Sequence, residues 1–198
     1  GNAASWRAGT VLGGSPGRGD GESLLAGVVI NEVLSHTDLP QKDSIELRNR
    51  SNAPVSISGW YLSDSRDHLT KFRIPGVVGQ PSEIILQPGQ YIVFDEDDFN
   101  PGGGLDPPVT FPNDFALDGA QGDDVWLVRG DAAGNAIGTA DYALFDGALN
   151  GVSFGREQSD AGLWYFYPQA SLTLDGDNSG PRVSPVVISE VQYNPGGF

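Results

Sequence analysis

Short runs in which apolar and polar residues alternate recur along this chain, and turn-forming residues close each run. The clearest run covers residues 44–49, where Ile45 and Leu47 fall on one face and Glu46 and Arg48 fall on the other. Helical spacing of apolar residues is scarce by comparison. The pattern predicts an all-β protein whose strands, about seven to nine in number, close into an antiparallel β-sandwich.

Turn chemistry divides the chain into the expected strands. Pro75 ends one of them because proline cannot donate to a β-ladder, and Pro88-Gly89 has the residue order of a type II turn. The chain is acidic and irregular over 95–106, and residues 129–135 are expected to turn. The expected strands cover residues 28–33, 44–49, 55–57, 60–62, 72–74, 83–86, 91–94, 124–128, 152–156 and 163–167.

The two ends of the chain resemble each other at one fixed offset. Residues 28–33 (Val-Val-Ile-Asn-Glu-Val) recur 158 positions later as residues 186–191 (Val-Val-Ile-Ser-Glu-Val), and Trp6 and Trp164 have the same separation. A period of this length predicts tandem copies of a whole domain, so the chain is expected to be a piece of a longer protein. The expected segments are the tail of a preceding repeat with a linker (1–26), a sandwich domain (27–168), a Gly/Asp/Pro linker (169–185) and the first strand of a following repeat (186–198).

Composition narrows the possible partners. The chain has 198 residues, with 11 basic against 26 acidic ones and a net charge of −15, which disfavours nucleic acid as a partner. No apolar run approaches the roughly 20 residues that cross a bilayer, so no membrane insertion of this segment is expected. An acidic chain with 28 Gly and no Cys suits a bacterial secreted or cell-surface protein that does without disulfides.

Six motifs, in order and spacing, resemble the lamin tail domain family. The resemblance covers residues 28–128, and residues 152–156 resemble the C-terminal extension of its bacterial members. It implies an immunoglobulin-like antiparallel β-sandwich with a short β-rich C-terminal extension. It also implies a non-catalytic interaction module, often an accessory part of long extracellular bacterial proteins, and it supplies no active site. The motifs are residues 29–33, 45–49, 55–62, 72–75, 86–91 and 123–127.

Two enzyme signatures fail on chemical grounds. Residues 13–17 fit the G-x-S-x-G pattern of a nucleophile elbow around Ser15, but Pro16 has no N–H for the oxyanion hole, which favours a linker turn. A zinc site needs three or four close nitrogen, sulfur or carboxylate ligands. His36 and His68 are the only histidines and cysteine is absent, so the sequence lacks such a set.

One pair of carboxylates has the positions that acid–base chemistry would need. Glu32 and Glu46 fall in strands that are expected to be neighbours. The competing interpretation places them on a solvated face, paired with Arg48, Arg50 or backbone donors. We favour that second interpretation, and the sequence therefore predicts no enzyme.

Calcium is the more serious chemical hypothesis, because this ion takes six to eight oxygen ligands. Asp175, Asp177 and Ser179 occupy positions one, three and five of an EF-type loop, and Gly180 follows at position six. The glutamate expected at position twelve is replaced by Val186. The loop is therefore a candidate calcium site with an incomplete ligand pattern.

A second carboxylate cluster offers calcium ligands at Asp95, Asp97 and Asp98, followed by a carbonyl-rich stretch over 101–106. The competing interpretation of both clusters is a solvated acidic turn, where Asp, Asn and Gly are favoured for conformational reasons. For both clusters, a calcium site and a solvated acidic turn are alternative interpretations of the sequence.

The aromatic run 164–167 is the last candidate. In a strand two of its rings face each way, and one face must belong to the core. The other face could be a carbohydrate-stacking platform, a cover over the linker or the contact with the next domain. Trp164 and Phe166 are the candidate ligand-binding residues.

The sequence therefore predicts a non-catalytic structural or interaction module that spaces, displays or docks other parts of a large surface protein. Its expected partners are neighbouring domains of the same polypeptide, with a polysaccharide or another surface protein as further possibilities. The alternative function is a calcium-supported module that binds carbohydrate or protein.

Overall fold

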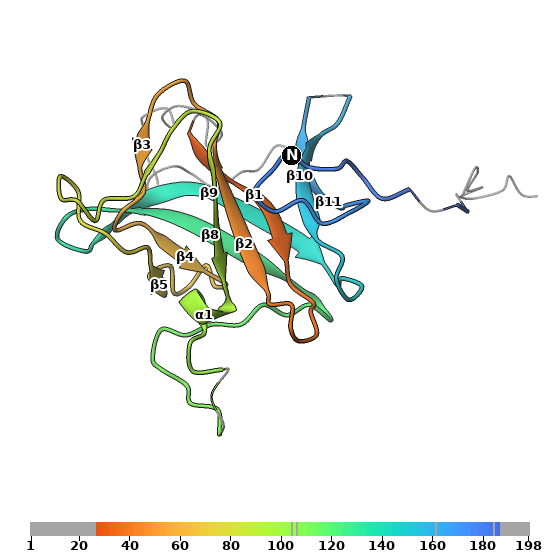
Figure 1. The fold of residues 1–198 in the computed structure, drawn as a ribbon, viewed down its shortest axis with the longest axis horizontal. Helices are drawn as coiled ribbons and strands as arrows, with labels where there is room; N and C mark the ends of the chain where they lie inside the picture. Colours follow the sequence, from red (N-terminus) through yellow and green to blue (C-terminus); the bar gives the residue numbers. More distant parts are fainter. Residues whose placement is uncertain (1–26, 104, 106, 161, 184, 187–198) are drawn as a thin grey trace, which may run out of the picture.

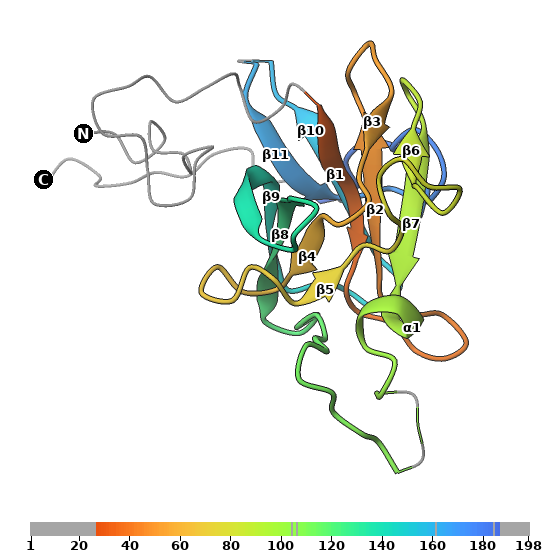
Figure 2. The same cartoon turned by 90° about the vertical axis from the view of Figure 1, so that its left-hand side faces the viewer.

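The computed structural model describes residues 27–103, 105, 107–160, 162–183 and 185–186. Its strands form two packed layers, a five-stranded and a four-stranded sheet, with a small two-stranded sheet at one end (Figures 1 and 2). All the strand pairs are antiparallel, so the expected all-β sandwich is confirmed. The described part of the chain has eleven strands, more than the seven to nine expected, because several have only two residues.

The five-stranded sheet has the order β11–β10–β1–β2–β7 and its outermost strands are β11 and β7. The most N-terminal strand, β1, is at its centre, between β2 and β10, a strand from the far end of the domain. Its strands are β1 (Val28–Leu34), β2 (Ser44–Asn49), β7 (Tyr91–Asp95), β10 (Phe154–Gln158) and β11 (Trp164–Pro168).

The four-stranded sheet has the order β5–β4–β8–β9. Its longest ladder joins β8 to β9, and no expected strand corresponds to β9. Its strands are β4 (Tyr61–Ser63), β5 (Phe72–Arg73), β8 (Gly122–Gly130) and β9 (Ala136–Asp146), and the two-stranded sheet consists of β3 (Val55–Ser56) and β6 (Ile85–Leu86).

The hydrophobic core lies between the two main sheets. On β2 the alternation holds as predicted, since Ile45 and Leu47 are fully buried in the core. Phe72 of β5 meets Phe94 of β7 edge to face, with 5.6 Å between the ring centroids. Such aromatic pairs add about 0.5–1.5 kcal/mol to the stability that burial alone provides.

The acidic segment after β7 contains a short helix, α1 (Glu96–Phe99), where the sequence predicts irregular structure. The buried ring of Phe99 stacks on Phe115, with 4.7 Å between the centroids and 13° between the planes. The stack lies at the base of a loop whose described residues, 101–103, 105 and 107–114, project away from the sheets below α1 (Figures 1 and 2).

The segment expected to be a linker folds back on the sandwich over residues 169–182, which we call the strap. Gln169 forms a β-bridge with Pro181, and the Arg182 N–H donates to the Pro168 carbonyl at 2.7 Å. Most of the expected linker therefore lies against the outer face of the five-stranded sheet, which is the face turned away from the core.

Several expectations lie outside the described residues, namely those for residues 1–26, which include Trp6 and the Ser15 motif, and for 187–198. In the described part of the chain, no helix is both long enough and apolar enough to cross a membrane.

Candidate functional site

The candidate site is the layer between the strap and the outer face of the five-stranded sheet. Ser44, Glu46 and Arg48 alternate with the core residues of β2, so their side chains point to this face. The strap reaches them from above: the Asp175 N–H donates to the Glu46 carboxylate, and the Asp177 carboxylate lies 3.1 Å from the Arg48 guanidinium.

Two carboxylates lie side by side at the centre of this layer. Glu32 of β1 is directly opposite Glu46 of β2 in the antiparallel register, and both residues are 0% exposed. The prediction that their strands are neighbours is confirmed. The expectation of a solvated face is wrong, because the strap covers the pair. Of the expected partners, backbone donors are present, namely the N–H groups of Thr173 and Asp175, whereas neither Arg48 nor Arg50 forms an ion pair with these carboxylates.

One residue of the strap, Thr173, donates two hydrogen bonds to the Glu32 carboxylate. The Thr173 N–H donates to the Glu32 carboxylate at 3.1 Å, and the Thr173 hydroxyl donates to its second oxygen at 2.7 Å. Ser153, which precedes β10, donates a third hydrogen bond. These donors satisfy the carboxylate and seal it from water, so the pair has no open approach for a substrate.

Burial raises the pKa of Glu46 to about 7. Hydrogen bonds from the Asn31 side chain, at 2.7 Å, and from the Asp175 N–H oppose this rise, whereas the nearby carboxylates of Glu32 and Asp175 add to it. A carboxyl with this pKa retains its proton into the neutral range, which limits the negative charge that the layer must hold.

A β-bulge explains why the sheet needs the strap. The pairing of β1 with β2 shifts register between Ile30 and Glu32, and β10 pairs only with the end of β1 that follows the bulge. The Asn178 side chain of the strap donates to the carbonyls of Asn31, at 3.3 Å, and Arg156, at 2.9 Å. It therefore satisfies backbone groups that the ladder leaves open.

The core side of the bulge carries a buried ion pair that the sequence analysis did not single out. Arg156 and Asp141 are in contact, at 8% and 2% exposure, and the Arg156 Nε–H donates to the Ile30 carbonyl at 2.7 Å. The Ile30 N–H donates to Asp141 at 2.8 Å. Burial raises the pKa of Asp141 to about 6, and the guanidinium opposes that rise. The only sequence signal was a charged residue, Arg156, within the expected strand over 152–156, because no strand was expected around Asp141.

Two of the candidate ligands of the EF-type loop, Asp177 and Ser179, contact other groups of the protein. One Asp177 oxygen lies 3.1 Å from Arg48 and accepts a hydrogen bond from the Tyr91 hydroxyl at 2.7 Å. The Ser179 hydroxyl donates to a strap carbonyl at 3.0 Å. Asp175 has a positive φ of 66°, so it provides the sharp turn that places its N–H on the acid pair.

The second acidic cluster forms the start of α1. Asp95 is the N-cap and accepts from the Asp97 N–H, while Asp98 accepts from the Asp95 N–H to complete a capping box. Asp97 also pairs with Lys42. Within the described ranges, no three His, Cys, Asp or Glu side chains are grouped so that they could hold a metal ion. Calcium binding at either cluster stays a prediction.

The aromatic candidates Trp164 and Phe166 lie on the inner side of β11 and are half-buried. The Arg50 guanidinium covers the Trp164 ring at 3.9 Å, and Arg156 lies over the Phe166 ring at 4.8 Å. A cation therefore covers one face of each ring, and that face is not available to stack on a ligand.

The other two rings of the run point outward. Tyr165 and Tyr167 are 44% and 37% exposed, and their centroids are 5.8 Å apart. Strand alternation required one outward pair, but the sequence could not say which pair it was.

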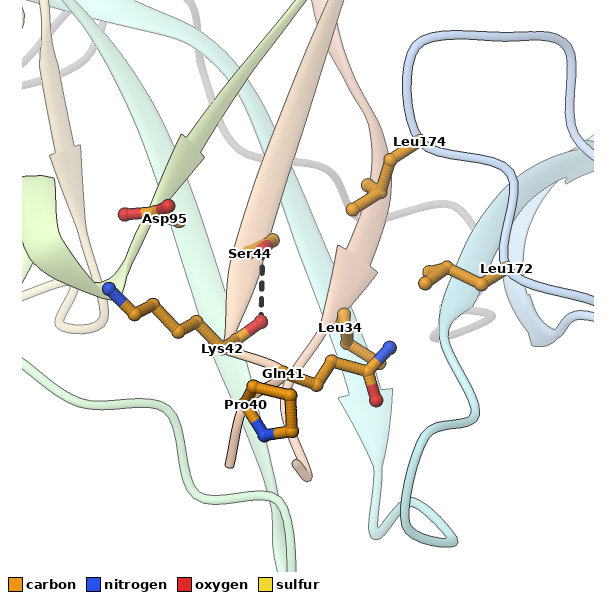
Figure 3. A pocket seen from close by; sticks show the side chains of 8 residues that line it. All are labelled: Leu34, Pro40, Gln41, Lys42, Ser44, Asp95, Leu172 and Leu174. Atoms are coloured by element: carbon orange, nitrogen blue, oxygen red, sulfur yellow. Dashed lines mark hydrogen bonds between the residues drawn. The ribbon is translucent and has the colours of Figure 1, made fainter. Parts of the chain in front are cut away.

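An open groove of about 320 Å³ lies where the strap leaves the lower end of the outer face uncovered (Figure 3). Leu172 and Leu174 of the strap face Leu34 of β1 across it, and Lys42 and Asp95 lie at the opposite side. Pro40, Gln41 and Ser44 complete the lining.

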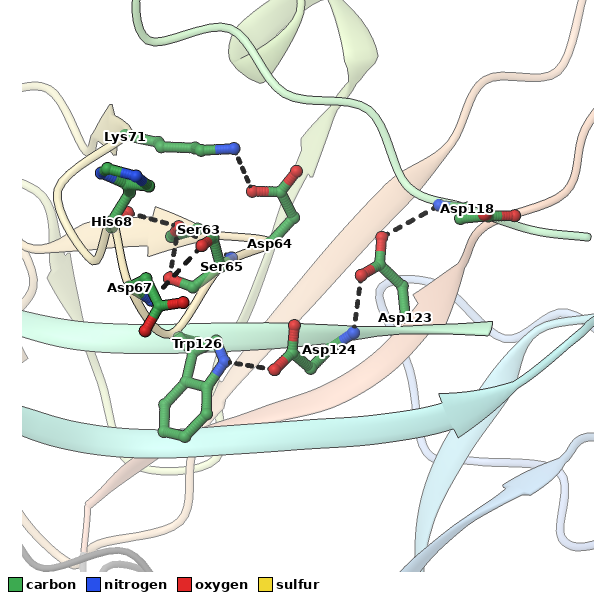
Figure 4. Close-up of polar contacts among 10 residues, drawn as sticks. All are labelled: Ser63, Asp64, Ser65, Asp67, His68, Lys71, Asp118, Asp123, Asp124 and Trp126. Atoms are coloured by element: carbon green, nitrogen blue, oxygen red, sulfur yellow. Dashed lines mark hydrogen bonds and ion pairs between the residues drawn. The ribbon is translucent and has the colours of Figure 1, made fainter. Parts of the chain in front are cut away.

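A second group of polar side chains lies at the turn after β4 and at the start of β8 (Figure 4). Lys71 pairs with Asp64, and the Trp126 indole donates to Asp124 at 2.8 Å. Asp123 accepts from the Asp118 N–H at 3.0 Å. Asp64 therefore orders the connection after β4, and Asp123 and Asp124 order the start of β8, so these carboxylates have a structural explanation.

The geometry defines a class of protein: an antiparallel β-sandwich whose buried acids are sealed by its own chain. A family model described as Lamin Tail Domain matches residues 23–143, more than half of the chain. The chain belongs to the lamin tail domain family, whose fold is immunoglobulin-like and whose members are generally non-catalytic. No curated protein and no solved structure gives a significant match.

Proposed function

We propose that this protein is a non-catalytic spacer and docking module within a larger bacterial protein that is secreted or displayed on the cell surface. The observation that carries the proposal is the strap. Thr173, Asp175 and Asn178 bond it to three strands, and Arg182 bonds beside the end of β11. The chain therefore leaves the sandwich from a fixed position, as a spacer that sets the angle to its neighbour requires.

The test is small-angle scattering from a chain that contains two consecutive 158-residue units. We expect an elongated particle with one preferred arrangement of its two domains. The matched control is Asn178→Ala in the first unit, which frees the strap at the bulge and should broaden the distribution of distances between the domains. A compact particle, or equal flexibility with and without the substitution, would contradict the proposal.

A second candidate function follows from the outward tyrosines. Tyr165 and Tyr167 form an exposed aromatic pair on the edge strand β11, which is the kind of surface that stacks on sugar rings or docks a partner protein. Affinity electrophoresis in gels containing cellulose derivatives, chitin fragments or dextran would test it. The candidate requires retardation that Tyr165→Ala reduces and Tyr61→Phe, a core tyrosine, leaves unchanged.

A further inference from the structure

The strap is attached to the sandwich by polar contacts rather than through the hydrophobic core. None of its residues belongs to the core, and within it only Gln169, where it begins, is buried. Its leucines, Leu172 and Leu174, line the open groove, and Leu172 is 37% exposed (Figure 3). A segment with so few buried apolar contacts opens locally at a lower cost in free energy than unfolding of the core.

Hydrogen bonds to two carboxyl groups hold the middle of the strap on the sheet. Thr173 donates twice to Glu32, and the Asp175 N–H donates to Glu46. Both glutamates are 0% exposed under the closed strap. Closing the strap therefore removes two carboxyl groups from water, which is costly for a group that is ionised.

The two carboxyl groups differ in how well they can hold a negative charge. Glu32 accepts three hydrogen bonds, two of them from Thr173. Glu46 accepts two, from Asn31 and Asp175. The two glutamates are directly opposite each other in the antiparallel register, and like charges at such positions are destabilising. Glu46 has fewer donors, so it is the group whose ionisation the closed strap opposes.

The strap itself contributes to the high pKa of Glu46. Burial is the main cause of the rise to about 7, and the carboxylates of Glu32 and Asp175 add to it. Hydrogen bonds from Asn31 and from the Asp175 N–H oppose the rise. Opening the strap exposes Glu46 to water and takes the Asp175 carboxylate away, so the pKa falls toward its ordinary value of 4.5.

The cation on the same face of β2 is engaged elsewhere. Arg48 lies two positions from Glu46, and its guanidinium is 3.1 Å from the Asp177 carboxylate. That carboxylate also accepts from the Tyr91 hydroxyl of β7, and the β7 residue directly opposite Glu46 is the apolar Val93. Among the described residues, no lysine or arginine lies within ion-pair distance of Glu46. An ionised Glu46 under the closed strap therefore has no cation to pair with.

We propose that the strap opens and closes with pH: it lies closed on the sheet while Glu46 is protonated, and it opens when Glu46 ionises. The proton binds the closed state more tightly than the open one, so it shifts the equilibrium toward closure. The equilibrium constant for opening should rise up to about tenfold per pH unit between pH 4.5 and about 7, and then level off. The inference rests on the proposed spacer function, in which opening would free the point where the chain leaves the sandwich.

Hydrogen exchange of the full chain at pH 5, 6, 7 and 8 tests this switch. The protection factor compares each exchange rate with that of an unstructured amide at the same pH, so the chemical effect of pH cancels. The Thr173 and Asp175 amides should lose protection on the order of 100-fold between pH 5 and pH 8. At every pH they should be less protected than the core amides of Ile45 and Leu47, because the strap opens without unfolding the sandwich.

Two variants identify the group that titrates. Glu46→Gln keeps the shape of the side chain but cannot ionise, so the protection of the strap should no longer change with pH. Asp43→Asn is the matched control. Burial raises the pKa of Asp43 to about 6, yet its carboxylate bonds to Thr37 and not to the strap. The Asp43→Asn strap should therefore keep the wild-type dependence on pH.

Three outcomes would overturn the switch. The first is wild-type protection that does not fall with pH, which needs no variant to fold. The second is equal protection of strap and core amides, which would mean that only global unfolding opens the strap. The third is a flat profile in Asp43→Asn. The scattering test of the spacer is made at pH 5, where the strap is closed, so failure of the switch and failure of the spacer function remain distinguishable.

Discussion

Glu32 and Glu46 lie directly opposite each other on β1 and β2, both fully buried. Among the described residues, no lysine or arginine nitrogen lies within ion-pair distance of either carboxylate. Burial, with the nearby Glu32 carboxylate adding to it, raises the pKa of Glu46 to about 7, so Glu46 keeps its proton into the neutral range. The strap that covers them is therefore coupled to pH.

The first prediction concerns the pH dependence of stability. The pKa of Glu46 is about 7 in the folded protein against 4.5 ordinarily, so the folded state binds the proton more tightly. The contribution of this group is fully present below pH 4.5 and is lost as the pH rises to about 7. The free energy of unfolding should fall over that interval by an amount on the order of 3 kcal/mol, measured by urea titration at a series of pH values.

Glu46→Gln removes the titrating group and should flatten this dependence. Part of the slope should remain, because the pKa of Asp141 is also raised, to about 6. Glu157→Gln, the same chemical change on β10 of the same sheet, should keep the wild-type profile. If Glu46→Gln and the wild type show equal slopes, Glu46 does not titrate in this interval.

The second prediction concerns the buried ion pair. Asp141→Ala leaves the Arg156 guanidinium buried without its partner, which should cost about 3–5 kcal/mol of stability. The double variant Asp141→Ala/Arg156→Met should lose clearly less than the sum of the single losses in urea unfolding at pH 7. Lys71→Met, at the more exposed pair with Asp64, should cost about 1 kcal/mol or less. Additive losses at Asp141 and Arg156 would argue against coupling.

The third prediction concerns the attachment of the strap. Thr173→Val keeps the side-chain shape but removes the hydroxyl that donates to Glu32, which should cost about 1.5 kcal/mol. Hydrogen exchange at the amides of Thr173 and Asp175 should become faster, because both donate to the acid pair. Thr70→Val, at an exposed position, should change neither quantity. Unchanged exchange in Thr173→Val would show that the hydroxyl does not hold the strap.

The fourth prediction concerns calcium. A calcium ion at the EF-type loop would displace Arg48 from Asp177, and one at the start of α1 would displace Lys42 from Asp97. We therefore expect the same melting temperature in millimolar calcium and in chelator. A rise of several degrees with calcium would contradict this expectation, since an ion that binds only the folded state stabilises it. Asp177→Asn and Asp97→Asn would then identify the cluster responsible.

Strands were predicted correctly where apolar and polar side chains alternate. A strand was missed where the sequence is rich in residues that are uncommon in strands. β2 is recognised because Ile45 and Leu47 alternate with Glu46 and Arg48, which places the two pairs on opposite faces of the strand. β9 was missed although it is long, because Ala, Gly and Asp occupy many of its positions and are depleted in strands. β9 forms through its ladder with β8 and through Asp141, which reaches Ile30 from a distant part of the chain.

The sequence by itself determined the all-β class, the family and the neighbouring positions of Glu32 and Glu46, because these depend on local alternation and on motif order. Only the tertiary structure decided that the expected linker is a strap, that the acid pair is buried, and that Tyr165 and Tyr167 rather than Trp164 and Phe166 face outward. The physical reason is that burial and hydrogen-bond partners come from residues far apart in the chain, and a Gly/Asp/Pro segment that packs on a sheet has the same composition as one that does not.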